Sequence, residues 1–244
     1  MKFNLAIENL QKDEAISFAK SVANSNNLKW EKGIEIIFAA CCDNISLAPK
    51  IGGKKDNQEQ VIGKWISKYW RGYDNRMSRR VSNPPGTVSD PIVETIIGTR
   101  LPNLNQTQLA EIVDAHRLSM SAENILGSLL EEYLEQNLLE YGWHFAWGET
   151  LGKVDFCRQN GELLQIKNRS NSENSSSNKI RAGTTIEKWY RVDASTGKYK
   201  WQELNDKYST NKFSEDNFRS FVVSCLLENP KALAVETDNS WLSS

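Results

Sequence analysis

Three polar residues close to one turn of the chain could do chemistry together: Asp155, Gln165 and Lys167. The segment 154–156 is typical of a short buried strand that carries one carboxylate, and the alternation of apolar and polar residues over 163–167 suits a second strand. The two strands would form a hairpin with an acid on one arm and Gln-x-Lys on the other. Because side chains alternate between the faces of a strand, Gln165 and Lys167 share one face. Asp155 must join that face if the three are to act together.

The length of the turn decides which face Asp155 takes. A two-residue Asn-Gly loop would pair Asp155 with Ile166, on the wrong face. A three-residue loop instead ends at Gly161, where a type I turn followed by a bulge favours a left-handed residue. We therefore predict the three-residue loop, with Asp155 opposite Gln165 and diagonal to the lysine.

These residues carry a resemblance to a known family. Asp-x9-Gln-x-Lys resembles the active-site motif of the PD-(D/E)xK nuclease superfamily, with Gln165 in the position usually held by Glu or Asp. A longer pattern resembles the type II restriction endonucleases of the SinI/AvaII type, which cut GGWCC in double-stranded DNA. It consists of the run 165–177, then Ile180-Arg181 and 188–191. The part that can be matched covers roughly 121–191, and the Gln removes one negative metal ligand from the motif.

The resemblance implies a magnesium-dependent hydrolysis of phosphodiester bonds. A divalent ion activates water and stabilises charge on a phosphate, and Mg²⁺ prefers oxygen ligands. By this resemblance Asp155 would be the essential metal ligand, helped by the Ile166 carbonyl, the Gln165 amide oxygen and Glu123. Lys167 would orient or deprotonate the water and offset the developing negative charge.

Glu123 enters this set through a helical pattern. The segment 121–141 predicts a helix with Ser121 as its N-cap and a buried stripe that includes Leu130 and Leu134. On a helical wheel Glu123 lies beside that stripe, whereas three later residues point away: Glu131, Glu132 and Glu135. A carboxylate on a buried face needs a partner or a metal, although first-turn placement near the helix dipole would also explain it. We expect Glu123 at the metal site ahead of Glu131 or Glu132.

Basic and amide side chains suggest where DNA would bind. The segment 168–191 is polar enough for a flexible linker, but Asn, Arg and Ser are also the side chains that reach bases and phosphates. Its candidates for DNA contact are Asn168, Arg169, Asn171, Arg181, Lys188 and Arg191. Arg79 and Arg80, before a Pro-Pro turn, could grip phosphates or belong to a solvated basic loop.

Composition limits the class of protein. The chain has 244 residues with 30 basic and 31 acidic side chains, so its net charge of −1 does not by itself indicate a nucleic-acid partner. Charge is uneven, however, because 64–80 holds six Lys or Arg against one Asp. No apolar run approaches a membrane span, and neither a signal peptide nor a Cys/His zinc site is expected. We therefore expect a cytoplasmic protein without a membrane partner.

The periodicity of apolar residues predicts the secondary structure and the fold class. Helices are expected at 5–22, 30–42, 59–71, 90–97, 107–118, 121–141, 201–208 and 216–227, and a strand at 143–147. We predict an α/β (α+β) fold with a helix-rich N-terminal half and a PD-(D/E)xK restriction-endonuclease-like core, whose mixed central β-sheet is flanked by helices. The predicted division is 1–118 for DNA binding or dimerisation and 119–244 for the nuclease core, with a recognition segment at 168–191.

The functional prediction is a type II restriction endonuclease. Cutting a palindrome implies a homodimer, and the function implies a cognate DNA methyltransferase without a stable complex. Two alternatives remain open: another PD-(D/E)xK nuclease for repair or junction cutting, and a non-catalytic DNA-binding protein in which Gln165 marks a degenerate nuclease site.

Overall fold

The structure is a computed structural model that describes residues 1–84, 90–170, 186–237 and 239–243. The predicted DNA contacts Asn171 and Arg181 lie outside the described residues. None of the described helices is long and apolar enough to cross a membrane.

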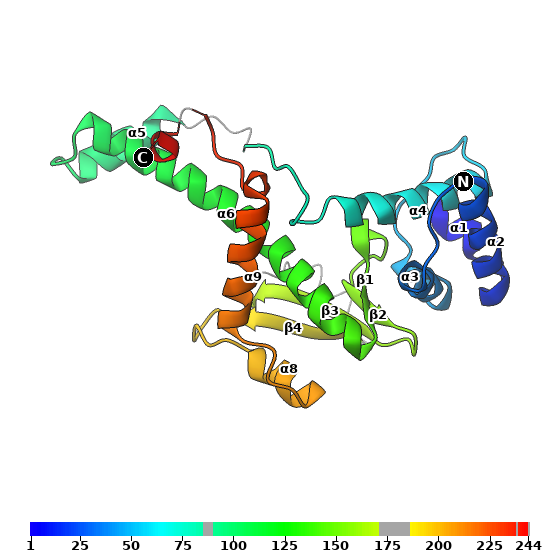
Figure 1. Ribbon diagram of the computed structural model, residues 1–244. Coiled ribbons are helices and arrows are strands. Elements are labelled where there is room, and N and C mark those ends of the chain that lie inside the picture. The colour runs from blue at the N-terminus through cyan, green and yellow to red at the C-terminus, as the bar shows by residue number, and fades with distance from the viewer. Residues whose placement is uncertain (85–89, 171–185, 238, 244) are drawn as a thin grey trace. The chain divides into compact units, whose positions relative to one another are not determined.

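Helices dominate the N-terminal half, as predicted (Figure 1). They are α1 (Phe3–Ile7), α2 (Lys12–Ser25), α3 (Lys32–Asp43), α4 (Gln58–Asp74), α5 (Pro91–Arg100) and α6 (Gln106–Leu138). The expected single helix over 5–22 is wrong, because the extended backbone at Gln11 separates α1 from α2. Helix α4 begins with a capping box in which Asn57 and Gln60 bond reciprocally, and Asp90 caps α5 through the backbone N–H of Ile92.

The sheet has four strands among the described residues, in the order β1-β2-β3-β4. They are β1 (Trp143–Phe145), β2 (Phe156–Arg158), β3 (Leu163–Arg169) and β4 (Ile186–Val192). The first three strands pair antiparallel and β4 runs parallel to β3, so the sheet is mixed, as predicted. Helices α8 (Trp201–Tyr208) and α9 (Glu215–Glu228) follow the sheet in the chain. Short 3₁₀ turns occur at Ile45–Leu47, Leu139–Tyr141, Trp147–Glu149, Pro230–Ala232 and Ser240–Ser243.

Helix α6 is continuous where two helices were expected. Ser121 is an interior residue of this helix, 5% exposed, and does not act as an N-cap. The polar Ser-Met-Ser sequence looks like a helix start, but it contains no Gly or Pro that would break the helix. The end of the helix agrees better with expectation, because Gly142 adopts φ +81° after a final 3₁₀ turn.

The chain forms two compact units, and each draws on two separate segments. The first unit comprises 1–76 and 130–221, and the second comprises 77–129 and 222–244. The sheet lies in the first unit, whereas α5 and most of α6 lie in the second. This grouping differs from the expected division at 118/119, which stays a prediction.

Aromatic side chains build the core of the first unit. Trp65 is fully buried, stacks on Phe3 at a centroid distance of 5.4 Å and meets the edge of Phe38 at 5.2 Å. A second cluster joins Tyr133 of α6 to Trp201 and Phe218 of α8 and α9, with centroids 5.8 and 5.3 Å from the tyrosine. Apolar burial of this kind is the main favourable term in folding, so these clusters fix the helices around the sheet.

One close backbone approach holds the segment that leads into β2. A Cβ added at Gly72 of α4 would lie 2.1 Å from the backbone nitrogen of Gly148, and one at Gly148 would lie 2.2 Å from the carbonyl oxygen of Lys68. Gly148 also has φ +67°. Only glycine suits both positions, and their contact places the 3₁₀ turn Trp147–Glu149 directly on α4.

Candidate active site

The β2–β3 hairpin has the predicted register. Phe156 pairs with Leu164 and Cys157 with Leu163, so the same register places Asp155 opposite Gln165. The loop has three residues: the Gly161 N–H donates to the Arg158 carbonyl at 3.0 Å, and Gly161 has φ +87°. This is the type I turn with a left-handed glycine that the sequence predicted.

Asp155 lies just beyond the last paired residue of β2, and hydrogen bonds fix its position. Its backbone N–H donates to the Leu164 carbonyl at 3.0 Å, and its own carbonyl accepts from the Ala146 N–H at 2.8 Å. Its carboxylate Oδ2 accepts from the Ile166 N–H at 2.7 Å. At the end of β2, the Asp155 carboxylate therefore accepts the hydrogen bond that a backbone carbonyl of a neighbouring strand would accept. This bond holds the carboxylate beside the Gln-x-Lys segment.

Gln165 and Lys167 occupy the middle of β3. Gln165 is 7% exposed, whereas Lys167 is half-buried. Leu164 and Ile166, which point to the opposite face of β3, are both buried. The burial of Gln165 shows in addition that the other face is covered at this level. An amide can be buried there at far lower cost than a carboxylate, because it carries no net charge.

Glu131 is the glutamate of α6 whose pKa is affected by residues of the hairpin. Burial in the first place, and the nearby Asp155 carboxylate in the second, raise the pKa of Glu131 to about 7, against the opposing effect of the Lys167 ammonium. Glu149 also raises this pKa. The structure thus brings Glu131, Asp155 and Lys167 within electrostatic reach of one another.

The expected burial of Glu123 is wrong. Its side chain is exposed, and it belongs to the second compact unit. The wheel placed Glu123 beside the stripe of Leu130 and Leu134, and both leucines are buried as expected. A wheel assumes one buried direction along the whole helix, but the N-terminal part of α6 is largely exposed, so adjacency to the stripe does not imply burial there. The same wheel pointed Glu131 away from the stripe, so the sequence pattern held no signal that favoured it over Glu123.

Two further glutamates of α6, Glu132 and Glu135, lie near Arg76, which follows the C-terminal end of α4. The Glu132 side chain is 1% exposed, and its Oε1 lies 3.7 Å from Nε of Arg76. The Arg76 guanidinium also stacks over the Tyr73 ring at 4.2 Å and donates to the Tyr73 carbonyl at 2.8 Å. Burial and the charge of Glu132 raise the pKa of Glu135. Arg76 therefore offsets the negative charge of these two carboxylates.

The parallel register sorts the predicted DNA contacts by face. Lys188 pairs with Gln165 and Tyr190 with Lys167, so their side chains share the face of the Gln-x-Lys segment. Arg169, two residues after Lys167, shares that face too. Arg169 and Lys188 are both exposed.

Arg191 points to the other face of β4 and is 9% exposed. Its Nε donates to the Asn168 side-chain oxygen at 2.9 Å, and its Nη1 lies 2.5 Å from Oε1 of Glu215. Its guanidinium also lies 5.3 Å from the Phe218 ring centroid. Asn168 and Arg191 therefore join β3, β4 and α9 within the fold. Arg79 is exposed and Arg80 half-buried, both in the second unit.

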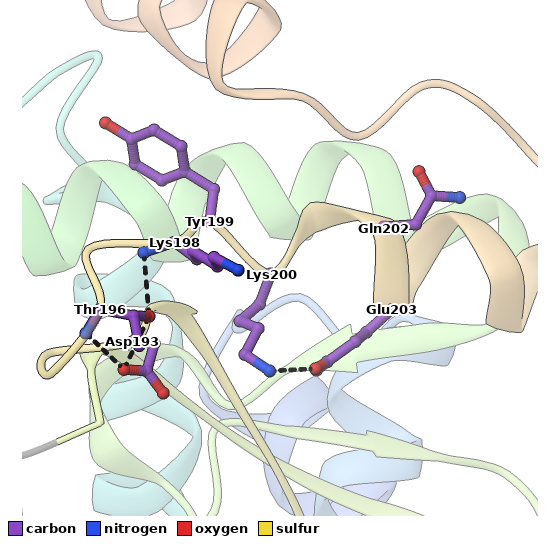
Figure 2. A pocket seen from close by; sticks show the side chains of 7 residues that line it. All are labelled: Asp193, Thr196, Lys198, Tyr199, Lys200, Gln202 and Glu203. Carbon is purple, nitrogen blue, oxygen red and sulfur yellow. Dashed lines mark hydrogen bonds and ion pairs between the residues drawn. The ribbon is translucent and has the colours of Figure 1, made fainter.

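A shallow pocket of about 410 Å³ lies just after β4 (Figure 2). The side chain of Asp193 accepts hydrogen bonds from Ser195 and Thr196, which lower its pKa to about 2. The Lys200 ammonium lies 2.8 Å from the Glu203 carboxylate. The Asp193 carboxylate is thus bonded within its own turn and the Lys200 ammonium is paired with Glu203, so these groups serve the local structure of the chain after β4.

The donor set at the hairpin fits a hard divalent ion only if neutral oxygens contribute. Among the described residues, His, Cys, Asp and Glu form no group of three that could hold a metal ion. Asp155 and Glu131 supply two carboxylates, and the Gln165 amide and Ile166 carbonyl can supply neutral oxygens. Burial in the first place and the Asp155 carboxylate in the second raise the pKa of Glu131, and a bound cation would lower it by favouring the charged carboxylate.

Comparisons with known proteins show what the chain is similar to. The model of the SinI restriction endonuclease family matches residues 15–228. The chain is 40% identical over 161 residues to the type II restriction enzyme Eco47I of Escherichia coli. The matched residues cover 64% of this chain and 69% of that enzyme. The chain is 41% identical over 148 residues to the type II restriction enzyme SinI of Salmonella infantis, covering 59% of this chain and 64% of that enzyme.

Proposed function

We propose that this chain, which belongs to the SinI restriction endonuclease family and is a type II restriction endonuclease, hydrolyses both strands of DNA at GGWCC with Mg²⁺ as cofactor. The observation that carries the proposal is the electrostatic coupling of Glu131, Asp155 and Lys167 beside the hairpin. Support for GGWCC comes from the resemblance of the run 165–177 to the SinI/AvaII type.

Each residue of the site has a role that follows from its chemistry. Mg²⁺, when bound, would supply positive charge and an acidified water. Asp155 and Glu131 would hold it, with the Gln165 amide oxygen and the Ile166 carbonyl as neutral ligands. The Ile166 N–H keeps Asp155 oriented. Lys167 would direct the attacking water and stabilise the negative charge that develops on the phosphate.

DNA would approach the face of the sheet that carries the Gln-x-Lys segment. Arg169 and Lys188 lie on that face and are proposed to contact phosphates or bases. Asn168 and Arg191 are not included, because their side chains bond to each other within the fold. Roles for Arg79, Arg80, Asn171 and Arg181 stay predictions.

The palindromic site implies a homodimer that presents one active site to each strand. The same function implies a methyltransferase that protects the host sequence without forming a stable complex with this chain. The non-catalytic alternative is not carried further, because Asp155 and Lys167 are both present and coupled to a third ionisable group.

The test is cleavage of a linear DNA that contains one GGWCC site, in the presence of Mg²⁺. We expect two products whose ends map within the site, and no cleavage by Asp155→Ala. Products that map to another sequence would overturn the assignment of GGWCC alone. Intact DNA with every divalent metal, despite a gel shift, would overturn the nuclease proposal.

A further inference from the structure

Exposed apolar side chains are concentrated in the second compact unit. Among the described residues, eleven of the sixteen large apolar side chains that are exposed belong to this unit, which holds less than a third of the chain. They are Val81, Ile92, Val93, Ile96, Leu101, Ile112, Met120, Val223, Leu227, Trp241 and Leu242. Contiguous exposed apolar surface usually marks a contact with another protein.

Helix α5 is the clearest case of exposed apolar surface in the second unit, because it has no buried residue. Ile92 is 59% exposed and Ile96 63% exposed. The side of α5 that meets the rest of the unit is marked by Gly98, whose added Cβ would lie 3.3 Å from Cδ1 of Leu109 on α6. Figure 1 shows α5 alongside the N-terminal part of α6.

The opposite side of α5 is a continuous apolar strip with one charge. At about 100° per residue, Ile92, Val93, Ile96 and Arg100 fall within a sector of about 100°, and Gly98 points away from it. We call these four residues the α5 face. Its one charged residue, Arg100, is exposed at the C-terminal end of the helix, and the exposed Asp90 caps the N-terminal end.

We propose that the α5 face binds the same face of a second copy of this chain, with the two helices antiparallel about a two-fold axis near Ile96. This proposal rests on the proposed function for its need of two copies. Charge complementarity selects the orientation, because each Arg100 then lies at the N-terminal end of its partner helix, near Asp90. Antiparallel packing also opposes the helix dipoles favourably. A two-fold contact needs a self-complementary patch, which this strip provides.

Substitution at the proposed axis gives the first test. Ile96→Glu would bring two carboxylates together in an apolar contact, whereas Leu5→Glu makes the same charge change at a site that is 52% exposed in the first unit. In sedimentation velocity without DNA, we expect wild type and Leu5→Glu to be dimers. The dimer dissociation constant of Ile96→Glu should rise by roughly 100-fold or more, because each dimer gains two unpaired buried charges. A monomeric wild type, or an Ile96→Glu variant that dimerises normally, would overturn the proposal.

Cross-linking gives a second test that does not depend on weakening the dimer. Ile96→Cys should form a disulfide with its copy under mild oxidation, whereas Glu111→Cys, exposed on α6, should not cross-link beyond the level of wild type. Equal cross-linking of the two variants would overturn the proposal. If both tests overturn the α5 contact, the proposed function can still hold, because the Asp155-dependent cleavage of a GGWCC site is measured separately.

Discussion

Helix α6 passes through two different environments, and the contrast explains where the active site can form. In the first unit, Glu131 is held beside Asp155 and Lys167, where burial raises its pKa to about 7. In the second unit, Glu123 is exposed. The first unit surrounds its helices with aromatic side chains, whereas the second leaves the apolar residues of α5 exposed. A glutamate on the same helix thus becomes a candidate ligand only where the surrounding core restricts its access to water.

The largest effect should come from the lysine of the site. Lys167→Met keeps most of the side-chain volume but removes the positive charge that faces Glu131 and Asp155. We expect a loss of single-turnover cleavage of about 100- to 1,000-fold, the usual effect of removing one stabilising donor. Lys50→Met, an exposed lysine of the first unit, serves as the control and should cleave like wild type. Equal rates for the two variants would remove Lys167 from the mechanism.

The ion pair between Arg76 and the buried Glu132 of α6 gives a prediction for the stability of the first unit. Arg76→Ala removes the guanidinium 3.7 Å from the buried Glu132 carboxylate. We expect a loss of about 3 kcal/mol in the free energy of unfolding, measured by urea denaturation, because a buried carboxylate loses a neighbouring positive charge. Arg71→Ala, which changes an exposed arginine of α4, should change stability little. If Arg76→Ala lowers the free energy of unfolding no more than Arg71→Ala does, Arg76 does not stabilise the buried Glu132 carboxylate.

The pKa of Glu131 predicts a dependence of stability on pH. The folded chain keeps a proton on Glu131 up to a pKa of about 7, whereas the unfolded chain releases it near the ordinary value of 4.5. Stability should therefore fall as pH rises through this window, by up to about 3 kcal/mol. Glu131→Gln should escape this loss and be more stable than wild type at pH 8, and Mg²⁺ should narrow the difference.

The matched control for this prediction is Glu123→Gln, which changes an exposed carboxylate on the same helix. Its stability should follow that of wild type across the whole pH range. Parallel pH profiles for wild type and Glu131→Gln would mean that Glu131 is not held in the buried, acidic environment described above.

The smallest effects concern backbone packing, and they should have opposite signs in the two units. Gly72→Ala forces a Cβ to within 2.1 Å of the Gly148 backbone and should destabilise the protein by about 1–3 kcal/mol. Gly127→Ala, on the part of α6 in the second unit, meets nothing within 4 Å. It should stabilise the protein by up to about 1 kcal/mol through better helix propensity. Thermal denaturation measures the change in stability of both variants. Changes of the same sign would contradict the difference in packing between the two units.

The hairpin was predictable because local rules determine it. The Asn-Gly sequence, the alternation over 163–167 and the requirement for a left-handed residue at Gly161 together leave one register in which Asp155 meets Gln165. The same kind of local signal located β1, α4 and Gly142 as the end of the α6 region.

The contribution of α6 was not predictable in this way. A helical wheel ranks positions by their distance from an apolar stripe, but it does not show which turn of the helix meets the hairpin. That depends on tertiary packing, which in the first unit places Glu131 within electrostatic reach of Asp155. Arg191 shows the same limit, because its residue type suggested a DNA contact but could not show that its side chain bonds to Asn168 on the opposite face of the sheet.

Single-turnover cleavage of a GGWCC-containing duplex by Glu131→Gln and Glu123→Gln, with Mg²⁺ binding titrated in parallel, tests the central claim most directly. If Glu131 and Asp155 form the metal site, Glu131→Gln should cut about 100-fold more slowly and bind Mg²⁺ more weakly, since it loses a charged ligand. Glu123→Gln should match wild type in both measurements. The reverse result, with cleavage lost in Glu123→Gln and kept in Glu131→Gln, would contradict the site described above.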